Sequence, residues 1–365
     1  MKALSWLWAS SSVMAFPCCH NINHRRHPSQ RSFPHSLSSM DYLSRLNESG
    51  PLEESTTERH ATTFGDLHRI RMPGEDQDGV SSVGSVGVPT FAATTSKGQN
   101  ENRFEDFLDS TIPTRSRGLE GAINQGPAFM LDNVLSKETC ERLIRDCENV
   151  GFVDFNSGKN NHSAMQVLVS SELAELVGQR LSRFVDVFQV EERRREMLEG
   201  CGMTVNQEDV RLVYAGLNRR WRIYRYDPDG EKTFAPHVDA GFPPSGLSQS
   251  GEELVWDASD PNGDLVVSRL TVLMYLNDDF VGGETNFFEP HNRSPEQNID
   301  FRGIRKIAAV RPVAGSCLVF PQAVGGDATQ YARKFWPLHE GSPVVSGRPK
   351  YVIRSDILFA EQREP

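Results

Sequence analysis

Two side chains that commonly bind metal ions lie two positions apart in the middle of the chain. They are His237 and Asp239, in the sequence Ala-Pro-His-Val-Asp. Successive side chains of an extended strand point to opposite faces, so these two point to the same side and can occupy adjacent positions on one ion. A distant third ligand, His339, would complete a face of two histidines and one carboxylate. Such a face suits non-haem Fe(II) and leaves three positions open for other ligands.

The His-x-Asp pair alone is weak evidence for a metal, because a hydrogen-bonded pair in a loop can have the same sequence. Besides His237 and His339, the chain has two further histidines after residue 126, His162 and His291. His291 follows Phe-Phe-Glu-Pro in an expected loop and is the alternative third ligand. His162 lies among asparagines and a serine, and we expect it at the surface.

Several other motifs surround the pair. Residues 218–230 read Asn-Arg-Arg-Trp-Arg-Ile-Tyr-Arg-Tyr-Asp-Pro-Asp-Gly, and residues 338–344 read Leu-His-Glu-Gly-Ser-Pro-Val. The others are Leu-Thr-Val-Leu-Met-Tyr-Leu-Asn-Asp-Asp-Phe at 270–280, Gly-Gly-Glu-Thr-Asn-Phe at 282–287, Gly-Ser-Cys-Leu-Val-Phe-Pro at 315–321, and Lys-Tyr-Val-Ile-Arg-Ser-Asp at 350–356. With these motifs in this order, the chain resembles the prolyl 4-hydroxylase-like branch of the Fe(II)/2-oxoglutarate dioxygenases.

The resemblance implies a role for each matching residue. His237, Asp239 and His339 would hold the iron, and Lys350 would pair with the distal carboxylate of 2-oxoglutarate. A carboxylate buried without such a cation would be costly. Tyr275 would hydrogen-bond the same carboxylate, and Tyr226 would line the cosubstrate site. The ordinary alternative for both tyrosines is a place in the hydrophobic core.

Arg354 competes with Lys350 for the distal carboxylate. Residues 350, 352 and 354 share one face of the expected last strand, because side chains alternate along it. Pro349 adds one residue between Gly347 and Lys350 compared with the family pattern, so the register of the basic residue is open at this point.

The resemblance also implies the reaction. We expect Fe(II)- and 2-oxoglutarate-dependent hydroxylation of a C–H bond, with release of succinate and CO2 and with L-ascorbate as a reductant of the iron. The substrate is a small molecule or a peptide, and a peptidyl proline is one candidate. One alternative is a catalytically silent jelly-roll module that binds a peptide or a sugar. Another is a zinc hydrolase on a similar barrel, which would need a general base and would leave Lys350 and Tyr275 unexplained.

The order of the expected elements predicts the fold class. Ser136 can cap a helix whose buried stripe includes Cys140 and Cys147, and a second helix follows Ser170 and continues into the charged run 191–196. After Gly202 the pattern becomes extended, with runs at 211–217, 221–226, 265–277, 306–312, 316–320 and 350–359. Helices followed by many strands predict an α+β fold with a double-stranded β-helix (jelly-roll) core and the N-terminal helices packed outside.

Composition divides the chain into three parts. Residues 1–15 resemble a signal peptide, residues 16–125 a disordered targeting segment and linker, and residues 126–365 the catalytic domain. The leader suggests the secretory pathway or a plastid, with a cytoplasmic tail as the alternative. A net charge of -10 argues against a nucleic-acid partner. No run approaches the roughly 18 to 20 apolar residues of a membrane span, so integral membrane association is not expected.

Overall fold

The computed structural model describes residues 60–73, 88–94, 104, 107–115, 128–156, 160–200, 211–239, 241–256, 263–289, 304–322 and 337–362. The expected signal peptide and His291 lie outside these residues. Among the residues described, no helix is long and apolar enough to cross a membrane.

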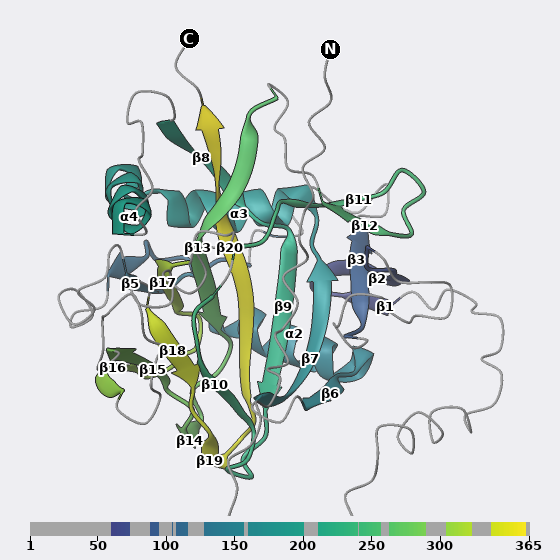
Figure 1. Cartoon of the computed structure of the whole chain (residues 1–365). Helices are drawn as coiled ribbons and strands as arrows, with labels where there is room; N and C mark the ends of the chain where they lie inside the picture. The colour runs from purple at the N-terminus through teal and green to yellow at the C-terminus, as the bar shows by residue number, and fades with distance from the viewer. Residues whose placement is uncertain are drawn as a thin grey trace, which may run out of the picture. The chain divides into compact units, whose positions relative to one another are not determined.

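Most strands belong to one large sheet, in which neighbours in space are seldom neighbours in the chain. Its main strands are β4 (Thr114–Arg115), β5 (Phe129–Asp132), β7 (Asn160–Leu168), β9 (Arg220–Tyr226), β10 (Thr233–His237), β13 (Leu265–Tyr275), β15 (Thr285–Glu289), β16 (Arg305–Val310), β17 (Cys317–Pro321), β18 (Leu338–Gly341) and β20 (Lys350–Gln362). Their spatial order is β16-β15-β18-β10-β7-β9-β20-β13-β17-β5-β4, and all these pairings are antiparallel. Figure 1 shows the two long strands β13 and β20 running next to each other. The expected α+β jelly-roll class is confirmed.

Shorter strands extend this arrangement. β6 (Val153–Asn156) pairs with β7, and β8 (Arg211–Leu217) pairs with the far part of β20. Two separate antiparallel pairs are β11 (Ser245–Leu247) with β12 (Leu254–Trp256), and β14 (Phe280–Gly282) with β19 (Val344–Gly347). The first pair lies in the long connection between β10 and β13.

Side-chain alternation along the long strands separates two cores. On β20, Tyr351 and Ile353 pack into the larger core, whereas Val352 between them packs into the smaller one. The larger core also receives the buried faces of the helices. The smaller core lies on the opposite face of these strands and is rich in aromatic residues, namely Tyr226, Tyr275, Phe280, Phe287 and Phe320. The candidate functional residues lie on this second face.

Within the described residues, three helices precede the long strands: α2 (Lys137–Val150), α3 (Ser171–Ser182) and α4 (Val187–Gly200). Ser136 and Ser170 accept hydrogen bonds from Thr139 N and Leu173 N and cap the first two helices as expected. The expected continuation of the second helix into the charged run is wrong. The helix ends in a tight turn in which Phe184 N donates to Leu181 O, and a separate helix starts at Val187.

Order begins well before the expected boundary at residue 126. β1 (His60–Thr62), β2 (Gly65–Ile70) and β3 (Thr90–Thr94) form a small extension of the sheet, in which β3 runs parallel to β7. Phe64 between β1 and β2 is fully buried and packs edge-on against Trp221, with ring centroids 6.2 Å apart. The sequence of this segment is rich in Gly, Ser and Thr, and only contact with the rest of the domain gives its few apolar side chains a place to be buried.

Candidate active site

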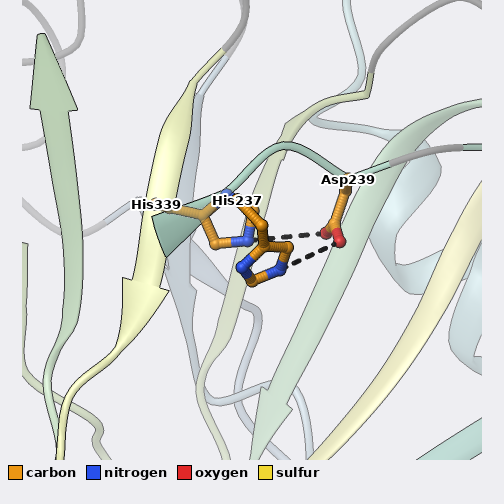
Figure 2. A group of neighbouring side chains, drawn as sticks. All are labelled: His237, Asp239 and His339. Carbon is orange, nitrogen blue, oxygen red and sulfur yellow. Dashed lines mark ion pairs between the residues drawn. The ribbon is translucent and has the colours of Figure 1, made fainter. Parts of the chain in front are cut away.

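His237, Asp239 and His339 converge on one point (Figure 2). His237 Nε2 lies 3.4 Å from Asp239 Oδ1, and His339 Nε2 lies 3.6 Å from Asp239 Oδ2. One ligand atom from each of the three side chains lies within 4.8 Å of the other two, which is close enough for a shared metal ion. Among the residues described, this is the one His, Cys, Asp and Glu cluster with metal-binding geometry.

Strand pairing brings the two histidines together. His237 is the last residue of β10, and in the antiparallel register of β10 and β18 it lies directly opposite His339. The ring centroids are 4.3 Å apart. Asp239 follows two residues after His237, just beyond the end of the strand, where its carboxylate can turn toward both rings.

Backbone carbonyls fix the orientation of both imidazoles. His237 Nδ1 is 2.7 Å from Ala235 O, and His339 Nδ1 is 3.1 Å from Pro337 O. A proton on each Nδ1 donates to the carbonyl and leaves the lone pair of Nε2 facing the cluster, which is the arrangement that metal-bound histidines adopt. Burial, followed by the nearby His237, lowers the pKa of His339 to about 3, so this ring is neutral and able to act as a ligand.

Asp239 is held ionised although it is buried. Burial alone would raise its pKa, but its charged partners, above all Arg354, outweigh this effect and hold the pKa of Asp239 well below its usual range. Arg354 Nη1 lies 3.1 Å from Oδ1, and Thr271 Oγ1 donates to Oδ2 at 2.8 Å. The carboxylate is therefore oriented by partners from two neighbouring strands. This donor set of two imidazoles and one carboxylate fits Fe(II).

Lys350 is a buried cation without a carboxylate partner among the described residues. Its side chain is 2% exposed, and its Nζ donates to Gly283 O at 2.7 Å. The same nitrogen lies 5.3 Å from the ring centroid of Tyr226 and 5.6 Å from that of Tyr275. Burial lowers the pKa of Lys350 to about 7, and the negative charge of Glu284 opposes the shift only in part. A buried ammonium in this state gains greatly from an incoming carboxylate.

The extra residue at Pro349 does not displace Lys350 from the strand. Lys350 lies opposite Tyr226 in the register of β20 and β9. Pro349 belongs to the turn from β19, where its carbonyl accepts a hydrogen bond from Asn277 Nδ2 at 2.8 Å. Tyr275 lies on the same face of the sheet as Lys350, and its hydroxyl is 2.7 Å from Thr285 Oγ1.

Arg354 lies on the same strand face but contacts different groups. It forms ion pairs with Asp239 at 3.1 Å and with Asp356 at 3.6 Å. Lys350 forms no ion pair with either carboxylate among the described residues. These contacts favour Lys350 over Arg354 as the residue for the cosubstrate carboxylate. Arg354 is already paired with two carboxylates of the protein.

His162 is not at the surface, contrary to expectation. It is 3% exposed and stacks on Phe234, with ring centroids 5.2 Å apart and an interplanar angle of 16°. The Phe234 ring in turn lies 4.1 Å from that of His237. Burial lowers the pKa of His162 to about 4, so it is a neutral member of the aromatic layer behind His237. The polar residues around it in the sequence gave the misleading signal, because alternate residues of β7 face opposite ways.

Sequence reasoning missed the polar residues that support the site. Thr271 orients Asp239, and Gln322 Nε2 donates both to Thr271 Oγ1 at 3.1 Å and to the carboxylate of Asp356. The available signal was alternation, since Thr271 lies four residues before Tyr275 and shares its strand face.

The comparison with protein families matches residues 221–355 to the 2OG-Fe(II) oxygenase superfamily. The match includes all three clustered side chains and Lys350. Residues 221–355 belong to the 2OG-Fe(II) oxygenase superfamily. The chain is therefore an oxidoreductase of the oxygenase class, and iron and 2-oxoglutarate are the cofactor and cosubstrate expected for it.

Solved structures similar to this oxygenase include two prolyl hydroxylases. A viral collagen prolyl hydroxylase from Paramecium Bursaria Chlorella virus-1 is 17% identical, covers 67% of this chain and 99% of its own, and has a TM-score of 0.32. A prolyl-4-hydroxylase from Pseudomonas putida is 14% identical, covers 66% and 94%, and has a TM-score of 0.31. A non-haem alpha-ketoglutarate-dependent epimerase from nogalamycin biosynthesis is 14% identical, covers 66% and 82%, and has a TM-score of 0.32. The comparison with curated proteins found no match.

Proposed function

We propose that this oxygenase hydroxylates a C–H bond of its substrate and uses His237, Asp239 and His339 to hold Fe(II). The observation that carries the proposal is the convergence of the three side chains with both Nε2 atoms turned toward the carboxylate. Bound iron and 2-oxoglutarate would supply the oxygen-activating chemistry, and the products would be hydroxylated substrate, succinate and CO2.

The residues of the chain would bind and orient these partners. Lys350 would pair with the distal carboxylate of 2-oxoglutarate, with Tyr226 and Tyr275 lining the same place. The support is that Lys350 is buried between these two rings and forms no ion pair with a described carboxylate. Arg354 and Thr271 would hold Asp239 in its ligand orientation. L-Ascorbate would act as the reductant that restores oxidised iron.

The proposal extends to the substrate class and the compartment. A small molecule or a peptide is proposed as substrate, with a peptidyl proline as one candidate. The leader would direct the protein to the secretory pathway or to a plastid, and a cytoplasmic location is the alternative. Nothing in the described site favours the silent binding module, because all three ligand side chains are present and converge.

A turnover assay of the full chain tests the proposal. The purified protein is supplied with Fe(II), ascorbate and 2-oxoglutarate, and succinate is followed without and with candidate substrates. Wild-type protein should release succinate, and His339→Ala should not. His68→Ala is a matched control, since His68 lies on β2 and hydrogen-bonds Gly251 O. Equal turnover in wild type and His339→Ala would contradict the metal assignment.

A further inference from the structure

Three arginines lie together next to Asp239, on the strand face that carries the smaller core. Arg220 and Arg222 are on β9, two residues apart and therefore on one face. Arg354 on β20 lies directly opposite Arg222 in the register of the two strands. One strand pair thus gathers three guanidinium groups, of which the sequence had pointed only to Arg354, as the competitor of Lys350.

The aromatic ring of Phe242 lies close to all three guanidinium groups. The guanidinium carbons of Arg222, Arg220 and Arg354 lie 4.1, 4.9 and 5.4 Å from the ring centroid of Phe242. Arg220 also lies 5.2 Å from the ring of Trp256, which comes from β12. Both rings belong to the segment that follows Asp239 in the chain, so this segment lies over the arginines and next to the metal ligands.

The carboxylates near the cluster are already engaged with one arginine. Asp239 and Asp356 both form ion pairs with Arg354. Arg220 donates from Nε to the neutral side chain of Gln166 at 2.6 Å, and no ion pair joins Arg220 or Arg222 to a described residue. Arg222 Nη2 is buried and has no hydrogen-bond partner among the described residues.

Three largely buried guanidinium groups repel one another, and this repulsion destabilises the folded protein unless more negative charge lies beside them. Burial, followed by the neighbouring Arg222, lowers the pKa of Arg220 to about 9, and burial and Arg354 lower that of Arg222. A buried cation without a partner is strongly unfavourable, so such groups are generally paired or bind a ligand. An anion from outside would relieve this cost and would meet two planar donor groups side by side.

We propose that Arg220 and Arg222, next to Arg354, bind an oxyanion, a carboxylate or a phosphate, carried by the substrate that is hydroxylated. The inference rests on the proposed function and names the substrate class of the same site. The anion would be held beside Asp239, so that the rest of the substrate lies near the metal ligands. This position is distinct from that of Lys350, because four residues of a strand separate Lys350 from Arg354 by about 13 Å.

Binding of small probes to the full chain tests the inference. The protein is loaded with Fe(II) and 2-oxoglutarate without oxygen, and the charge-transfer absorbance of the chelate shows that both are bound. Phenylacetate, phenyl phosphate and the neutral phenylacetamide are then titrated. We expect at least one anion to perturb the absorbance and to bind at least roughly tenfold more tightly than the amide, since charge-assisted hydrogen bonds dominate such sites. Comparison of the two anions shows which oxyanion is preferred.

Matched variants locate the effect. Arg222→Gln should weaken anion binding roughly tenfold or more, and Arg222→Lys should restore part of it because the charge is kept. Arg225→Gln is the control, since Arg225 lies on the same strand but pairs with Asp227 and Glu148 on the opposite face. Thermal melting checks that each variant is folded.

Three outcomes would overturn the inference. The amide could bind as well as the anions, the two glutamine variants could bind the anions equally, or the anions could abolish the absorbance by displacing 2-oxoglutarate. If wild-type protein never develops the absorbance, the proposed function itself fails and the inference falls with it. A normal absorbance that responds to no anion overturns the inference alone.

Discussion

The protonation of Lys350 should make binding of 2-oxoglutarate depend on pH. Its ammonium has a pKa lowered to about 7 by burial, and the groups that face it are Glu284 and the rings of Tyr226 and Tyr275. Burial raises the pKa of both tyrosines, so they stay neutral over the working range. An incoming carboxylate favours charged Lys350 and raises its pKa. Binding above pH 7 must therefore take up a proton.

The magnitude follows from the fraction of Lys350 that is charged in the free protein. This fraction is near its maximum at pH 6 and falls to about one tenth at pH 8 for a pKa of about 7, so the affinity should drop roughly tenfold, or about 1.4 kcal/mol. Below pH 6 the affinity should level off. The direction is fixed by the sign of the shift, because a lysine with a lowered pKa loses its charge as pH rises through that value.

The assay compares two keto acids under anaerobic conditions with Fe(II). 2-Oxoglutarate carries the distal carboxylate and 2-oxobutyrate lacks it, so the ratio of their dissociation constants isolates Lys350 from any titration at the metal. The ratio should change about tenfold between pH 6 and pH 8 in wild type. In Lys350→Arg it should be nearly constant, because arginine stays charged. A wild-type ratio that is independent of pH, or an equal slope in Lys350→Arg, would refute the reasoning.

Three further predictions concern ligands, cosubstrate and domain limits. His339→Ala should lose most bound iron, measured by metal analysis after Fe(II) loading, because two remaining ligands cannot complete the face; near-normal iron content would move the third ligand elsewhere. Lys350→Ala should raise the KM for 2-oxoglutarate roughly thirty- to a thousandfold, with a smaller effect on kcat, and this increase in KM should exceed that of Arg354→Ala. A larger increase in Arg354→Ala would instead assign the distal carboxylate to Arg354. Deleting residues 1–58 should leave the melting temperature unchanged, whereas deleting residues 1–125 should lower it strongly, because it removes β1 to β4 and buried Phe64; equal melting temperatures would show that these strands add no stability.

Local patterns were sufficient for the elements whose stability is local. Ser136 and Ser170 marked two helix starts correctly, because a cap is a contact between residues three apart. Alternation also placed Lys350 and Arg354 on one strand face, because the direction of a side chain in a strand depends only on the local backbone. The strands β1 to β3 were missed because their apolar side chains are few, and what buries them is contributed by distant residues such as Trp221.

The sequence by itself determined that His237 and Asp239 point to the same side, and the motif match indicated His339 as their partner. Only the tertiary structure decided that His339 lies opposite His237, since that pairing depends on the register of two strands far apart in the chain. The structure also separated Lys350 from Arg354. A strand face gives the direction of a side chain but not its neighbours, and the neighbours come from other strands: two tyrosine rings for Lys350, and Asp239 with two further arginines for Arg354.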